Sequence, residues 1–304
     1  MIDLLENCIS RVGKGYVEIR GHSREVFSVT VKDGKVERIS RGLNKGACAR
    51  VLIDGSWGFS STTIINKRSL MRLLKDAESL ANSSKPRKKR LVKIAPVQPH
   101  IDKYETSMKK DPRRENLEVL FEDVLEADKE ARGYSKNVAS TSISLSVIDD
   151  ELYFVNSEGA RIMQRIVRCF GGASIIAKSR GKIASAHETI GGQTGLEIFE
   201  ETPIKEAALE AAKRAVRIAP KRVVPGGYSD VVLENRIVGL LAHEAVGHTA
   251  EADLVYSGSF LSGKIGRKIA SEMITLVDDG LLPSGFGTMK YDDEGTPTER
   301  TVII

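Results

Sequence analysis

The chain has 304 residues, of which 41% are hydrophobic and 29% are charged, so it can form a buried core rather than a disordered coil. Its 46 Lys and Arg residues against 41 Asp and Glu residues leave a net charge of only +5, which argues against a dedicated polyanion-binding protein. With 5% aromatic residues and one Trp, the chain offers few platforms on which nucleic-acid bases could stack.

The three cysteines, Cys8, Cys48 and Cys169, are far apart in sequence. Their odd number and the lack of a CxxC pair argue against a disulfide framework and a zinc finger, and are typical of a reducing cytoplasm. No run of about 18 apolar residues predicts a membrane-spanning helix, and the acidic amphipathic start at residues 1–6 does not resemble a signal peptide. We therefore expect a soluble cytoplasmic protein that does not contact membranes.

The first part of the chain, residues 16–63, has the alternating pattern of a β-meander. Asp33-Gly34 follows one alternating run and precedes another, which is a strong hairpin signal because both central residues of that turn need a positive φ. A third strand is expected at residues 47–53, and the spacing of apolar residues predicts a helix over residues 69–81.

A basic, polar segment follows at residues 82–90, with Lys and Arg dominating residues 85–90. One interpretation is a patch that binds nucleic acid or acts as a localisation signal. The other is a solvated linker between domains, which the proline and the absence of an apolar face favour.

Beyond this segment, the pattern predicts an amphipathic helix at residues 112–132, then strands at 142–147 and 151–155 separated by a turn at Asp149-Asp150. Strands at 160–169 and 173–178, a hairpin turn at Ser179-Arg180-Gly181 and an Ala-rich helix at 206–218 complete a second antiparallel sheet. A second linker is expected at residues 220–227, before a strand at 229–233.

Strand pairs followed by helices, without regular βαβ alternation, predict an α+β fold with antiparallel sheets and packed helices in two modules. We place the amino-terminal module at residues 1–93 and the central module at 94–220. Residues 221–304 are expected to begin a third, β-rich domain, which opens with a helix that holds the candidate metal ligands. We expect this third domain to be incomplete.

That helix, over residues 234–253, is expected to be at least half buried and holds His243, Glu244 and His248. Two neutral imidazoles are suitable ligands for Zn²⁺, and a neighbouring carboxylate can accept a proton from water that the metal has made acidic. Composition predicts only about 0.01 such matches by chance, although an accidental match remains the alternative. The His187-Glu188 dipeptide has no second histidine nearby, and we interpret it as structural.

The spacing of this motif is unusual. His243 and His248 are five residues apart, which corresponds to about 140° around a regular α-helix, so their side chains would diverge. A π-turn aligns residues five apart, and a break at Gly247 could also bring the two rings together. We therefore predict a π-bulge or a break between Glu244 and His248.

These residues and several others resemble the TldD branch of the TldD/TldE (PmbA) metalloproteases. The resemblance extends over nearly the whole chain and is most specific at His243-Glu-Ala-Val-Gly-His248 with Glu251 and Asp253. Further matching segments are residues 46–51, 54–59, 155–159, 260–266, 270–280 and 291–297.

The resemblance implies an intracellular zinc peptidase that cleaves unfolded or flexible peptides. It implies that His243 and His248 are metal ligands, that Glu244 is the general base, and that the protein forms a homodimer or a heterodimer with a TldE-like subunit. The TldE-like branch lacks these three residues, which places this chain on the catalytic side.

The chain departs from the family at its carboxyl end, because relatives continue through a β-rich segment whose Cys is a third metal ligand. None of the three cysteines is in the matching region, so a fragment, a split gene product and a degenerate member all stay open. The alternative to a peptidase is a non-catalytic, truncated interaction subunit of a TldD/TldE-type complex. DNA binding through residues 85–90 ranks last.

Overall fold

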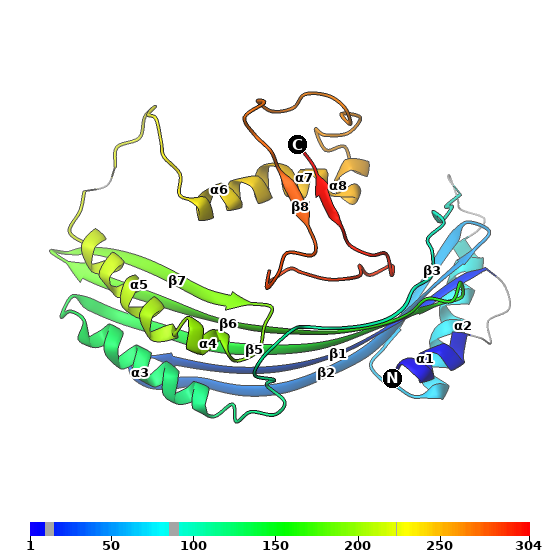
Figure 1. The fold of residues 1–304 in the computed structure, drawn as a ribbon, viewed down its shortest axis with the longest axis horizontal. Coiled ribbons are helices and arrows are strands. Elements are labelled where there is room, and N and C mark those ends of the chain that lie inside the picture. Colours follow the sequence, from blue (N-terminus) through cyan, green and yellow to red (C-terminus); the bar gives the residue numbers. More distant parts are fainter. Residues whose placement is uncertain (10–14, 85–90, 223) are drawn as a thin grey trace. The chain divides into compact units, whose positions relative to one another are not determined.

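The structure is a computed structural model that describes residues 1–9, 15–84, 91–222 and 224–304 (Figure 1). Its helices are α1 (Ile2–Ile9), α2 (Lys67–Ser84), α3 (Val119–Gly133), α4 (Ile198–Glu201), α5 (Ile204–Ile218), α6 (Asn235–Ala242), the π-helical turn η2 (His243–Gly247), α7 (His248–Ala250) and α8 (Ala252–Tyr256). Its strands are β1 (Tyr16–Lys32), β2 (Lys35–Ile53), β3 (Ser56–Thr62), β4 (Ile101–Glu105), β5 (Val138–Asn156), β6 (Arg161–Ser179), β7 (Lys182–Gly192), β8 (Val277–Asp279) and β9 (Arg300–Val302).

The described residues form two compact units. Unit 1 consists of residues 1–221 and 281–298, and unit 2 consists of residues 222–280 and 299–304. The expected α+β class is confirmed, because helices pack against a sheet whose strands are mostly antiparallel. The basic residues 85–90 lie outside the described residues, while residues 82–84 end helix α2.

Unit 1 contains one seven-stranded sheet in the order β3-β2-β1-β5-β6-β4, with β7 also paired to β6. The expectation of two separate sheets was wrong. Strand β1 pairs with β5 from Glu18↔Asn156 to Lys32↔Ser142, so the amino-terminal and central segments share one ladder of hydrogen bonds. Sequence patterns identify strands but not which distant strand lies beside them.

The predicted hairpins are confirmed where the turn chemistry is local. Asp33 and Gly34 have φ values of 50° and 79°, and Arg180 and Gly181 have φ values of 49° and 77°. Positive φ at both central residues matches the twist of the flanking strands. The helices predicted at 69–81 and 206–218 are α2 and α5, whose apolar stripes are buried.

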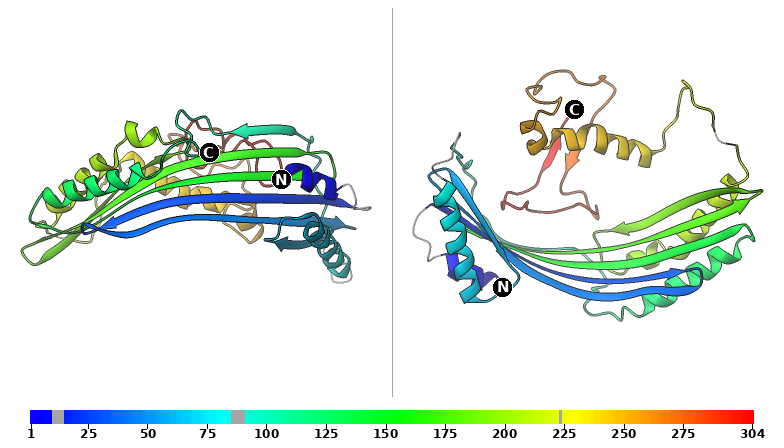
Figure 2. Two further views of the ribbon diagram at one scale, coloured as in Figure 1. Left: turned by 90° about the horizontal axis from the view of Figure 1, so that it is seen from below. Right: turned by 180° about the vertical axis from the view of Figure 1, so that it is seen from behind.

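The helices α1, α2, α3 and α5 cover one face of the sheet, as Figures 1 and 2 show. Odd-numbered residues of β1 and β5 point to this face. Four of them, Val17, Val29, Ile143 and Val155, are at most 2% exposed. Period-two alternation explains this segregation. Two apolar clusters result, one under α1 and α2 and one under α3 and α5.

The turn predicted at Asp149-Asp150 does not exist, because β5 runs straight through both residues. Each carboxylate is buried but paired: Arg165 Nη2 lies 2.7 Å from Asp149 Oδ2, and Arg24 Nε lies 2.7 Å from Asp150 Oδ1. Buried charges are tolerated when partners neutralise them. The strands predicted at 160–169 and 173–178 likewise merge into β6.

The other face of the sheet holds part of the carboxyl-terminal segment of unit 1. Tyr291 is 5% exposed and packs in a small cluster with Phe154, Ala160 and Ile162. The side-chain amide of Gln164 donates to the carbonyl oxygen of Tyr291 and accepts from its N–H, both at 3.0 Å. Two hydrogen bonds and buried aromatic area therefore fix residues 281–298 to the sheet.

Unit 2 holds helices α6 to α8 and the antiparallel pair of β8 and β9. None of its described residues is buried, so the expectation that the motif helix is at least half buried was wrong. The strand predicted at 229–233 is also absent, and those residues have no regular structure. Across the described residues, no helix is long and apolar enough to cross a membrane.

Candidate metal centre

The motif helix changes its hydrogen-bonding pattern at the first histidine. After α6, the N–H of His248 donates to the carbonyl oxygen of His243, five residues earlier, and residues 243–247 form a π-helical turn. This confirms the prediction that the five-residue spacing needs a π-bulge or a break. Single π-turns are rare in helices and frequent at functional sites.

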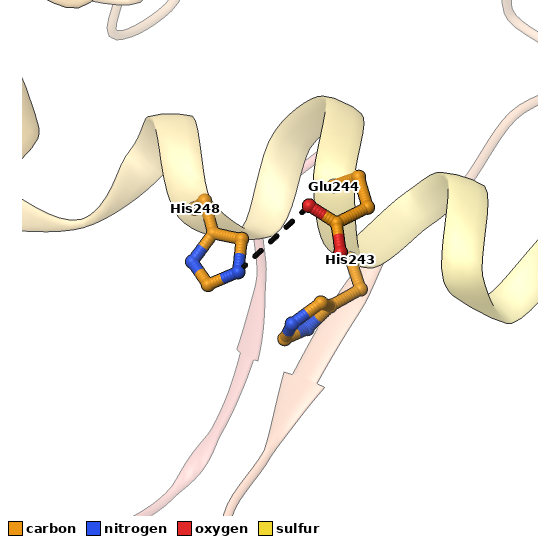
Figure 3. A group of neighbouring side chains, drawn as sticks. All are labelled: His243, Glu244 and His248. Atoms are coloured by element: carbon orange, nitrogen blue, oxygen red, sulfur yellow. Dashed lines mark ion pairs between the residues drawn. The ribbon is translucent and has the colours of Figure 1, made fainter.

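The π-turn brings the two imidazoles to the same side of the helix (Figure 3). Their ring centroids are 4.4 Å apart, and the ring planes meet at 67°. A regular α-helix would separate the two residues by about 140°. The π-turn therefore aligns two rings that the five-residue spacing would separate in a regular α-helix.

Gly247 does not break the helix. Its φ of −49° and ψ of −64° are helical, so the second device proposed from the sequence is not used. A Cβ at this position would lie 3.8 Å from His243 Nδ1, an ordinary van der Waals distance. The helical backbone therefore continues from His243 to His248 without a break.

Glu244 lies beside the two histidines. Its Oε2 is 4.0 Å from His248 Nε2, and its side chain is 62% exposed. His243, Glu244 and His248 each offer one ligand atom, a ring nitrogen or a carboxylate oxygen. These three atoms lie within 4.8 Å of one another. Within the described ranges, this is the group of His, Cys, Asp and Glu side chains whose geometry could hold a metal ion.

The remaining ring nitrogen of His248 faces a different carboxylate. Nδ1 of His248 lies 2.9 Å from Oε1 of Glu251, the residue that follows α7. Glu251 is part of the sequence motif, but the motif alone indicates no role for it. The signal that could have found it is the i,i+3 spacing, which places two side chains on one helix face.

A cavity of about 600 Å³ within unit 2 borders the site. His243, Gly247 and Glu251 line one side of it, and Val277 and Asp278 of β8 line another. The candidate ligands thus border a space of the size that small-molecule and peptide groups occupy.

The donor set fits zinc. Imidazole nitrogens bind Zn²⁺ at about 2.0–2.1 Å, and a catalytic site needs open positions for water and substrate. The side chains of His243 and Glu244 are exposed and that of His248 is partly exposed, so such positions exist. None of the three cysteines lies in unit 2. Burial raises the pKa of the Cys169 thiol to about 12, which disfavours the thiolate that metals bind.

The second His-Glu pair is structural, as interpreted from the sequence. His187 lies within β7, and its Nδ1 is 2.7 Å from Ser174 Oγ on the neighbouring strand. Glu188 is 7% exposed and forms an ion pair with Arg214 of α5. Neither residue has a second histidine beside it among the described residues.

The chain is similar to proteins named as metalloproteases. A metalloprotease of Methanocaldococcus jannaschii is 33% identical over 290 residues, which cover 95% of this chain and 63% of that protein. A zinc metalloprotease TldD homolog of Saccharolobus solfataricus is 22% identical over 300 residues, covering 96% of this chain and 63% of that protein. The chain therefore spans a little under two thirds of the length of these relatives.

Two crystal structures share the fold. A protein of Bacteroides thetaiotaomicron, described as a candidate modulator of DNA gyrase, gives a TM-score of 0.81 at 20% identity, over 99% of this chain and 69% of that one. TldE from Thermococcus kodakarensis gives a TM-score of 0.70 at 20% identity, over 100% of this chain and 66% of that one.

Models of three domains of one family match the chain in order. The PmbA/TldA metallopeptidase domain 1 matches residues 17–81, the central domain matches 110–218, and the C-terminal domain matches 225–304. Together with the similarity to the metalloproteases, these matches support the resemblance that the sequence motifs indicated. The chain belongs to the PmbA/TldD metallopeptidase family.

Proposed function

We propose that the protein is a zinc-dependent peptidase whose site contains His243 and His248 as metal ligands and Glu244 as general base. The observation that carries this proposal is the π-turn that places both imidazoles on one side of the helix, 4.4 Å apart, next to a carboxylate. The name of the zinc metalloprotease relative supports the choice of metal. Zinc supplies Lewis acidity, which makes water acidic enough to lose a proton near neutral pH.

The two histidines and the glutamate have different roles in this proposal. His243 and His248 bind through neutral imidazole nitrogens, which carry lone pairs for a metal. Glu244 stands next to them with an exposed carboxylate, which can accept a proton from water and return it to the leaving amine. Because this carboxylate is exposed, it can reach a substrate without any movement of buried side chains.

The substrates we propose are unfolded or flexible peptides. The cavity beside His243 is lined in part by β8, which pairs with β9 along one edge. An extended peptide could add to a strand edge through main-chain hydrogen bonds, which do not depend on side-chain identity. Backbone recognition of this kind suits a substrate that lacks its own fold.

The organisation and partners of the protein are also proposals. We propose three domains at residues 1–93, 94–220 and 221–304, a cytoplasmic location, and a homodimer or a heterodimer with a TldE-like subunit. The similarity in fold to TldE supports the pairing. Because catalytic zinc normally has three protein ligands, we propose that a further ligand, the Cys that the resemblance implies, joins His243 and His248.

The experiment that tests this function compares the parent protein with Glu244→Gln. We expect both proteins to bind zinc equally and the variant to cleave an unfolded reporter peptide about 10²- to 10⁴-fold more slowly, because its amide cannot accept the proton. Glu272→Gln is the matched control, since Glu272 is an exposed glutamate of unit 2 that pairs with Lys268. Equal cleavage by Glu244→Gln and the parent would contradict the mechanism.

A second candidate is a non-catalytic interaction subunit. The observation that favours it is the exposed apolar surface of unit 2, where no described residue is buried. Large apolar side chains that are 49–102% exposed there include Ile237, Val238, Leu240, Leu241, Phe260, Ile265 and Met273. Protein that binds no zinc but forms a stable complex with a TldE-like subunit would favour this candidate over the peptidase.

A further inference from the structure

The two ring nitrogens of His248 face two different carboxylates. Nδ1 lies 2.9 Å from Glu251 Oε1, while Nε2 lies 4.0 Å from Glu244 Oε2 and points to the side where His243 stands. We infer that Glu251 is a positioning residue, which holds the neutral His248 ring in the Nδ1–H form and leaves the Nε2 lone pair for a metal. The inference deepens the proposed function and rests on its metal site.

The chemistry of the pair fixes the direction of this hydrogen bond. An ionised carboxylate only accepts hydrogen bonds, and a neutral imidazole carries one N–H. A short contact between Glu251 Oε1 and Nδ1 therefore requires the proton on Nδ1. Histidines that bind metals commonly donate their other N–H to a carboxylate, which fixes the tautomer and the ring orientation.

The backbone brings Glu251 to this place. Helix α7 ends at Ala250, and Glu251 leaves helical geometry with a φ of −59° and a ψ of 137°. Its N–H still donates to the carbonyl oxygen of His248 at 3.2 Å, and its own carbonyl accepts from Val255 at 2.9 Å. Glu251 is thus held at the junction of α7 and α8, with its carboxylate against the ring.

The exposure of the His248–Glu251 pair limits its contribution to folding stability. The side chains of His248 and Glu251 are 43% and 51% exposed, and exposed pairs of this kind contribute little to folding stability. The orientation of the ring is the property that the contact sets. We therefore expect loss of Glu251 to act on metal affinity and not on folding.

His243 provides an internal comparison. No side chain of the described residues forms a hydrogen bond with its ring, and the ring lies 4.4 Å from that of His248. Removal of Glu251 should therefore change the tautomer of His248 and leave that of His243 as it was.

The first measurement is made on metal-free protein. With ¹⁵N-labelled histidine at pH 8, where an ordinary imidazole is neutral, NMR reports which ring nitrogen carries the proton. We expect His248 to be Nδ1–H in the parent, mostly Nε2–H in Glu251→Ala, and partly restored in Glu251→Gln, whose amide oxygen still accepts. An unchanged His248 tautomer in Glu251→Ala would overturn the inference.

The second measurement is zinc affinity by competition with a chromogenic chelator. We expect Glu251→Ala to bind zinc about 10- to 100-fold more weakly, Glu251→Gln to lose less, and Glu272→Gln to match the parent. Equal affinities for the parent and Glu251→Ala would overturn the inference. A parent that binds no zinc would refute the proposed function, while the tautomer measurement, which needs no metal, would still decide the role of Glu251.

Discussion

The N–H of His248 donates to the carbonyl oxygen of His243, so one turn of this helix closes over five residues instead of four. Because of that turn, two histidines whose spacing would separate them by about 140° in a regular helix share one side. The metal hypothesis depends on this local departure from α-helical geometry, and altering the spacing tests it directly.

We predict that deletion of Val246 preserves zinc binding, whereas insertion of one Ala after Val246 weakens it at least about 100-fold. Four-residue spacing aligns the rings within about 40° in a regular helix, while six-residue spacing puts them about 120° apart. Zinc affinity by chelator competition checks both variants, with circular dichroism to verify the fold. Tight binding by the insertion variant would show that the alignment is irrelevant.

We predict that His243→Ala and His248→Ala each lower zinc affinity at least about 100-fold, because each removes one of two imidazole donors. His187→Ala is the matched control: that ring contacts Ser174 and has no second histidine beside it among the described residues. Metal content after dialysis against a fixed zinc concentration measures the effect. If His187→Ala lost as much zinc as the other two, the site would be wrongly located.

A third prediction concerns acid stability and Asp111. Two hydrogen bonds from Arg165 to this carboxylate, at 2.6 and 2.9 Å, lower the pKa of Asp111 to about 2, against about 3.9 in an unfolded chain. The pKa is depressed in the folded state, so the stabilisation is present above about pH 4 and is lost as the pH falls towards 2.

We therefore expect Asp111→Asn to lower the free energy of unfolding by about 2 kcal/mol at pH 7, a difference that vanishes near pH 2. Urea unfolding of the parent and the variant across this range measures it. Asp76→Asn is the control, because Asp76 and Arg72 form an exposed pair at 3.7 Å. A deficit in Asp111→Asn that persists at pH 2 would contradict the assigned cause.

A fourth prediction concerns the contact of α2 with β3. A Cβ added at Gly58 would lie 1.8 Å from the carbonyl oxygen of Ala77, so the helix and the strand would have to separate. We expect Gly58→Ala to destabilise unit 1 by about 3 kcal/mol or more, as overpacking does. Gly42→Ala is the control, because a Cβ there meets nothing within 4 Å. Thermal unfolding compares the two, and equal midpoints would refute the close approach.

Local chemistry made several elements predictable. The Asp33-Gly34 turn follows from residues that tolerate positive φ, and the helix at 69–81 follows from its apolar period. The helix predicted from residue 112 begins only at Val119. The carboxylate of Asp111 binds Arg165 and accepts from the N–H of Arg113, which holds this segment in a turn. Arg165 is remote in sequence, so no local pattern shows this.

The candidate site was likewise only partly predictable from the sequence. The sequence pattern predicted His243, Glu244 and His248 as site residues and a π-turn or a break to align the two rings. The structure has the π-turn. The role of Glu251 was missed because its contact with His248 depends on a helix end whose position the apolar pattern does not specify. The exposure of this helix was also mispredicted, since apolar side chains alone do not say whether another layer covers them.

The sequence by itself determined the turns at Asp33-Gly34 and Arg180-Gly181, the helices α2 and α5, and the π-turn or break that the metal motif requires. Backbone conformational preference and side-chain period act over only a few residues. The tertiary structure decided that β1 pairs with β5 to join two expected sheets, and that Asp149 and Asp150 continue a strand instead of turning. Strand pairing and charge neutralisation join residues more than a hundred positions apart, as with Arg24 and Asp150. Their energies depend on which groups meet in space, and that information is not local.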